Sequence, residues 1–152
     1  MKKQLAIIML VFVSLGAAAQ HGHESHPQEK GPSFKDEKLG SAYRYYTHLK
    51  DALVASNAGE AKQAAGELQK SLVNVANSKK PVDAAKTIAT SSDLNNQRKS
   101  FSNLSNEMTS LIKASKLASG TLYVEYCPMA NNNEGAFWLS NEMEIKNHIS
   151  AR

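Results

Sequence analysis

Soft metal-binding side chains stand close together near the C-terminal end of the chain, in the run Cys127-Pro128-Met129. Cys127 is the only cysteine of the 152 residues, and one proline separates it from the thioether of Met129. Because Pro128 fixes its own φ angle and has no N–H to donate, the run is expected to form a rigid bend outside any helix. Thiolate and thioether favour Cu(I), so the bend is a candidate copper half-site, with His148 as a further candidate ligand.

The same segment also allows an interpretation without a metal. Free cysteine is among the most buried residue types, so Cys127 and Met129 can simply be packed under Trp138. In that case Tyr126 and Trp138 are the candidate contact residues of a surface that docks onto a partner protein. A metal-binding accessory protein and a non-metal interaction module both remain open from these residues.

A second group of candidate ligands lies near the N-terminus, where His21, His23 and His26 stand in a polar stretch that contains two prolines. This stretch shows no periodicity, and residues 20–35 are therefore expected to form a flexible arm. Imidazole nitrogen suits Cu(II), Zn(II) or Ni(II), so the arm is an auxiliary candidate site. Its alternative role is a solvated linker.

The first 19 residues have the pattern of a secretory signal peptide. Lys2 and Lys3 precede an apolar run over residues 5–15, and three alanines at 17–19 supply the small residues of a cleavage site. The apolar run is shorter than the ~20 residues that a spanning helix needs. The sequence thus predicts export to the periplasm, with no stable membrane insertion after cleavage.

The charge balance and the absence of known motifs argue against a nucleic-acid-binding protein and against an enzyme. The chain has 18 Lys and Arg against 14 Asp and Glu, and two of the lysines belong to the signal peptide, so nucleic acid is not an expected partner. A single cysteine allows no internal disulfide. The sequence has no HExxH motif, paired-cysteine motif or glycine-rich phosphate loop, and we expect no enzymatic activity.

Residues 36–152 are expected to form one helical domain. Apolar residues recur at steps of three and four over about 36–55, 61–75 and 94–115, which predicts three long helices, and Pro81 suits the first turn of a short one through Ile88. The segment 56–59 offers a cap for the second helix, and Ser91 and Ser92 offer one for the last. The predicted fold is all-α, an up-and-down antiparallel bundle with a C-terminal extended or loop segment.

A longer motif surrounds the cysteine, in the run YVEYCPMANNNEGAFWLSNEMEIKN over residues 123–147. Together with LKDALVAS at 49–56 and the helix that carries Arg98 and Phe101, it resembles an uncharacterised family of secreted bacterial domains. Such domains occur alone or fused to the periplasmic adaptor subunits of heavy-metal efflux pumps. The resemblance implies a helical domain that handles copper or a related metal, with an efflux adaptor or pump as partner.

The C-terminal tail departs from that family. Its members continue after the Ile-x-Asn of residues 145–147 as Pro-Tyr-Phe-Gly, followed by a Met and a Cys-Gly, whereas this chain reads His-Ile-Ser-Ala-Arg over 148–152. Loss of a single C from a coding stretch AAC CCA TAT TTC GGC A gives AAC CAT ATT TCG GCA, which encodes Asn-His-Ile-Ser-Ala. We therefore expect that the tail is a frameshifted end and that the downstream Met and Cys partners are lost.

Overall fold

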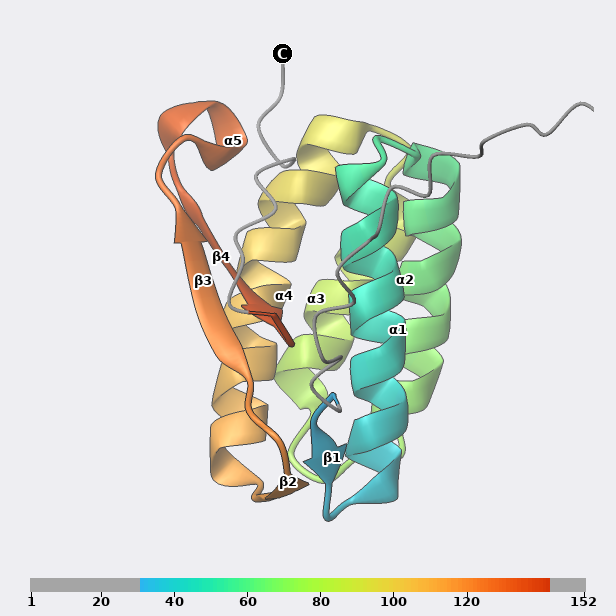
Figure 1. The fold of residues 1–152 in the computed structure, drawn as a ribbon. Coiled ribbons are helices and arrows are strands. Elements are labelled where there is room, and N and C mark those ends of the chain that lie inside the picture. Colours follow the sequence, from blue (N-terminus) through green and yellow to red (C-terminus); the bar gives the residue numbers. More distant parts are fainter. Residues whose placement is uncertain (1–30, 143–152) are drawn as a thin grey trace, which may run out of the picture.

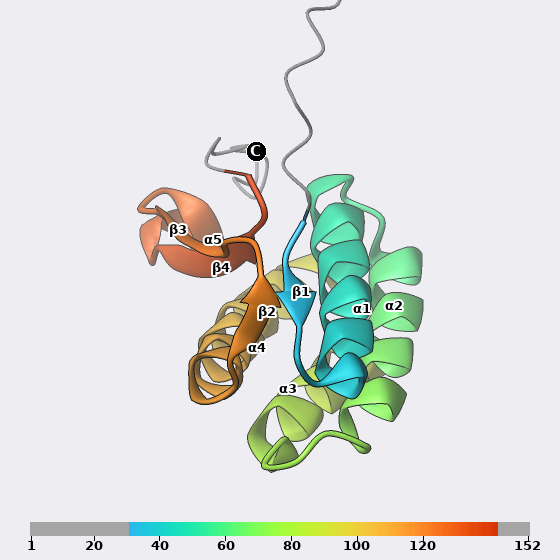
Figure 2. The ribbon, with the colours of Figure 1, turned by 60° about the horizontal axis from the view of Figure 1, so that its bottom comes forward.

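A computed structural model describes residues 31–142. The predicted signal peptide, residues 20–30 of the predicted arm and the tail 143–152 lie outside the described residues. The described part is mostly helical, with two small antiparallel strand pairs (Figures 1 and 2). In chain order its elements are β1 (Ser33–Phe34), α1 (Glu37–Val54), α2 (Ala58–Leu72), α3 (Lys79–Thr90), α4 (Leu94–Ala114), β2 (Leu117–Ser119), β3 (Tyr123–Cys127), α5 (Ala130–Asn133) and β4 (Ala136–Ser140).

The predicted helices are confirmed as α1 to α4, and their starts follow the side chains that cap them. Asp36 accepts hydrogen bonds from the N–H groups of Lys38 and Leu39, and Asn57 accepts one from Glu60. The cap predicted for α4 is wrong by one or two residues, because Asp93 caps this helix and not Ser91 or Ser92. The side chain of Ser91 instead accepts the N–H of Asp93 and so supports the capping residue.

The all-α prediction is correct for the helical part only: the C-terminal segment, predicted to be extended or a loop, forms an antiparallel hairpin. β3 pairs with β4 from Tyr123 opposite Ser140 to Cys127 opposite Ala136. Each strand carries two aromatic residues, and successive side chains point to opposite faces, which stabilises a pleated pair more than a loop. In Figure 1, β4 lies between α4 and β3, so that β3 is the outer strand of the hairpin.

The second strand pair joins the two ends of the helical region. β1 pairs with β2, with Ser33 opposite Ser119. The ring of Phe34 lies 5.3 Å from that of Tyr43 on α1, and a Cβ added to Gly120 would lie 2.9 Å from the Cα of Pro32. The arm predicted for residues 20–35 is therefore too long at its C-terminal end, because β1 belongs to the folded domain.

An aromatic stack forms the centre of the core. The Tyr46 ring lies 5.9 Å from Tyr43 on the same helix and 5.2 Å from Phe101 on α4. Between α1 and α2, the core consists mainly of leucines and alanines. Within residues 31–142, no helix has both the length and the apolar composition needed to cross a membrane.

Candidate metal and docking site

The hairpin places the two predicted soft ligands in different environments. Cys127 is the last residue of β3, opposite Ala136, and only 7% of its surface is exposed. Met129 precedes α5 and is 65% exposed. The bend around Pro128 therefore separates a buried thiol from an exposed thioether. The alternative in which both residues are buried is therefore correct for Cys127 and wrong for Met129.

Three consecutive asparagines shape the turn that follows the bend. Asn131, Asn132 and Asn133 have φ angles of 53°, 59° and 70°. Asparagine tolerates this left-handed region better than most residues, which explains how a run of such angles is accommodated. Gly135 closes the turn at φ 77°, and its N–H donates to the carbonyl of Ala130.

The outer side of the hairpin carries a concentration of exposed apolar side chains. The rings of Tyr126 and Phe137 lie 4.5 Å apart across the two strands. Among the described residues, six large hydrophobic side chains are exposed, and four of them lie on the hairpin or its turn. We call these four the hairpin surface: Val124, Tyr126, Met129 and Phe137.

The two predicted docking residues differ in position. Tyr126 is 46% exposed and belongs to the hairpin surface, but Trp138 is 3% exposed and belongs to the core. The prediction of a Trp138 contact is therefore wrong. Phe137, 44% exposed, takes its place because neighbouring strand residues point to opposite faces. The strand pairing identifies Phe137 as the contact residue. Phe137 lies opposite the exposed Tyr126, whereas Trp138 lies opposite the buried Glu125.

A buried tyrosine hydroxyl holds β4 against the helices. The Oη of Tyr46 accepts the backbone N–H of Leu139 at 3.0 Å and lies 2.8 Å from the Oγ of Ser105 on α4. Burial raises the pKa of Tyr46 well above its usual range, so this hydroxyl stays protonated at neutral pH.

A buried carboxylate lies on the inner face of β3. Glu125 is 7% exposed, and its Oε1 has no hydrogen-bond partner within residues 31–142. It lies on the buried face of β3, because the exposed Val124 and Tyr126 on either side of it point to the opposite face. A buried polar atom without a partner is costly, so it requires an explanation.

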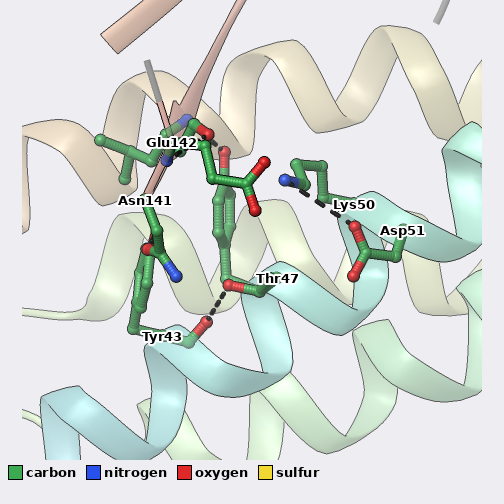
Figure 3. Close-up of polar contacts among 9 residues, drawn as sticks. Tyr43, Thr47, Lys50, Asp51, Asn141 and Glu142 are labelled. Carbon is green, nitrogen blue, oxygen red and sulfur yellow. Dashed lines mark hydrogen bonds and ion pairs between the residues drawn. The ribbon is translucent and has the colours of Figure 1, made fainter. Parts of the chain in front are cut away.

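An open groove of about 740 Å³ runs along α1 beside the end of β4. The Tyr43 hydroxyl donates to Oδ1 of Asn141 at 2.7 Å, and the hydroxyl of Thr47 donates to the Tyr43 carbonyl. Figure 3 shows these residues together with Lys50, whose amine lies 3.8 Å from a carboxylate oxygen of Asp51. The groove is lined by both acidic and basic side chains, and its lining within residues 31–142 contains neither cysteine nor methionine.

The remaining predicted ligands are four histidines near the two ends of the chain. His21, His23, His26 and His148 lie outside the described residues. His48 is exposed and lies 3.4 Å from the carboxylate of Glu60. Within residues 31–142, no group of three or more His, Cys, Asp or Glu side chains is placed to hold a metal ion.

A family model described as a protein of unknown function, DUF3347, matches residues 42–120, which is just over half of the chain. The chain belongs to the DUF3347 family. The DUF3347 match extends from α1 to the residue after β2, so the hairpin with Cys127 and Met129 follows the matched range. No curated protein and no solved structure matches this DUF3347 chain.

Proposed function

We propose that the chain is an exported, non-catalytic accessory protein that binds a soft metal ion, Cu(I) in the first place, at the Cys127-Pro128-Met129 bend. One observation carries the proposal: the hairpin places the single thiol, which is buried, and an exposed thioether on the two sides of one proline. Thiolate and thioether together select Cu(I) over harder cations. The signal-peptide pattern of residues 1–19 supports a location in the periplasm.

The different exposure of the two ligands suggests their order of use. Met129 is 65% exposed and is the first ligand that an arriving ion meets, whereas Cys127 is only 7% exposed. Two ligands leave the coordination of Cu(I) open. The remaining positions are for His21, His23, His26 or His148 of the same chain, or for a ligand from a partner such as an efflux adaptor or pump. An open site of this kind suits transfer of an ion more than storage.

Competition with a chromogenic Cu(I) chelator tests the proposal on the mature chain. We expect Cys127→Ser to abolish competition and Met129→Leu to weaken Cu(I) binding by about tenfold, since one of two soft ligands is lost. His48→Gln is the matched control, because it removes an exposed imidazole that lies away from the bend. A variant that lacks residues 20–30 measures the contribution of the arm. Failure of the intact chain to compete at all would refute the proposal.

A second candidate function, docking onto a protein partner without a metal, is favoured by the hairpin surface. Large apolar side chains gathered on one exposed face are typical of interaction sites. Binding to a purified efflux adaptor tests this candidate. Phe137→Ser should weaken the complex, whereas Val73→Ser should not, because Val73 is an equally apolar and 66% exposed residue at the end of α2. Equal effects of the two substitutions would reject the hairpin surface as the contact.

A further inference from the structure

The hairpin has one edge that is tied to the bundle and one that is not. Leu139 of β4 donates its N–H to the Tyr46 hydroxyl and therefore points this group away from β3. In an antiparallel pair, a residue that points its N–H away from its neighbour strand belongs to a non-hydrogen-bonded pair. Val124 lies opposite Leu139, so the N–H and C=O of Val124 point away from β4.

The backbone of β3 has the same orientation two residues further along, at Tyr126. Tyr126 lies opposite Phe137 in the next non-hydrogen-bonded pair, and its backbone groups also point outward. No other strand pairs with β3 within the part of the chain that the structure describes. Val124 and Tyr126 are also the exposed residues of β3, at 47% and 46%. The outer edge of β3 thus offers two donors and two acceptors in the spacing of a strand.

We propose that the outer edge of β3 binds an extended segment of another protein, in which a lysine or arginine stands between two apolar residues. The inference deepens the second candidate function and names its partner by chemistry. Backbone groups at Val124 and Tyr126 require an extended chain, because only a strand matches their spacing. The apolar residues of the partner would lie on the outer face, beside Val124 and Tyr126.

The basic residue follows from Glu125. If a strand is added at the outer edge of β3, its residue opposite Glu125 points to the inner face of the hairpin. The two residues form a non-hydrogen-bonded pair, in which side chains approach most closely. A lysine or arginine at this position donates to the Glu125 carboxylate, whose Oε1 is buried without a partner within residues 31–142. The open edge and the unsatisfied carboxylate are thereby explained by one occupant.

A second copy of this chain is a poorer occupant. Antiparallel pairing of two β3 edges through Val124 and Tyr126 places Glu125 directly opposite its own copy. Two carboxylates in such a pair repel each other, and the buried Oε1 gains no donor. The charge of the site therefore favours a foreign basic strand.

The test uses the mature chain and the capped peptide Thr-Thr-Val-Lys-Val-Thr-Thr, followed by NMR amide shifts and amide exchange. We expect saturable binding with exchange slowed at least about tenfold at Val124 and Tyr126. The amides of Tyr123, Glu125 and Cys127, which already face β4, should change little. A peptide with Glu in place of Lys should bind about tenfold more weakly, and one with N-methylated valines should not bind.

Two substitutions in the protein sharpen the result. Val124→Pro removes an outward donor that β4 does not use, so the fold should persist while peptide binding is lost, and Val124→Ala is the control that keeps the donor. Glu125→Gln should remove the preference for Lys over Glu. Equal binding by Val124→Pro and Val124→Ala, no binding of any peptide, or a concentration-dependent dimer in sedimentation would overturn the proposal. Adaptor binding that persists in Val124→Pro would reject the strand edge and leave the hairpin surface as the contact.

Discussion

The backbone N–H of Leu139 donates to the side-chain hydroxyl of Tyr46 at 3.0 Å, so a residue of the first helix satisfies the inner edge of the last strand. The same hydroxyl lies 2.8 Å from the Oγ of Ser105, which connects α1, α4 and β4 at one oxygen atom. All three residues are buried. This contact fixes both the position of the hairpin and which edge of it remains open.

Replacement of Tyr46 by phenylalanine should therefore destabilise the domain. The change leaves the Leu139 N–H and the Ser105 hydroxyl without this partner, which costs about 1–3 kcal/mol for buried groups. Urea unfolding followed by circular dichroism measures the free energy of unfolding. Tyr45→Phe is the matched control, since Tyr45 lies on the same helix but is 39% exposed. Equal stability of the two variants would contradict the role of the Tyr46 hydroxyl.

Substitution of two glycines by alanine should have opposite effects. Gly66 lies inside α2 with open space around its Cα, so Gly66→Ala should stabilise the domain by about 0.5–1 kcal/mol. Gly135 has a φ of 77°, and a Cβ there would lie 2.5 Å from the Tyr126 hydroxyl. Gly135→Ala should destabilise the domain by about 1–2 kcal/mol and displace the Tyr126 ring. Thermal unfolding compares the two variants, and a shift of the same sign in both would be inconsistent with the structure.

Stability should fall at alkaline pH. Burial is the main cause that raises the pKa of Tyr43 and of Tyr46 above the unperturbed value of 10.0. The unfolded chain then loses protons that the folded chain keeps, so stability is fully present below about pH 10 and declines as the pH rises further. Urea midpoints between about pH 9 and pH 11.5 test the sign. Tyr46→Phe should flatten the decline, and a midpoint that increases over this range would contradict the prediction.

The Cys127 thiol should react slowly in the folded protein. Because it is 7% exposed, we expect a disulfide reagent to modify it at least about tenfold more slowly in buffer than in urea. The absorbance of the released thiolate measures both rates. A Met129→Ala variant should show the same ratio, since Met129 lies outside the buried face. Equal rates in buffer and urea would place the thiol at the surface.

The helices were predictable because their signal is local. The apolar residues of α1, α2 and α4 recur within a few turns, and Asp36 and Asn57 mark the starts of α1 and α2 directly in the sequence. β1 was missed for the opposite reason. It has only two residues, and its partner β2 follows four helices later in the chain, so no pattern within either segment indicates the pairing.

The candidate site was predictable in place but not in orientation. The Cys127-Pro128-Met129 bend was expected and lies at the end of β3, but the sequence does not determine which face of the hairpin meets the bundle. That phase depends on the contact between Tyr46 and Leu139, which are far apart in sequence. A shift of one residue exchanges Phe137 with Trp138, and this is the error that the prediction made.

The pairing of β1 with β2 has a consequence for the segments that flank the helical region. Residues 31–34 and 117–120 lie side by side, so the chain enters and leaves the four-helix region at one place. For the same reason, a segment attached before Gly31 and the hairpin that follows Gly120 emerge from neighbouring points of the bundle, where both can reach the same binding partner.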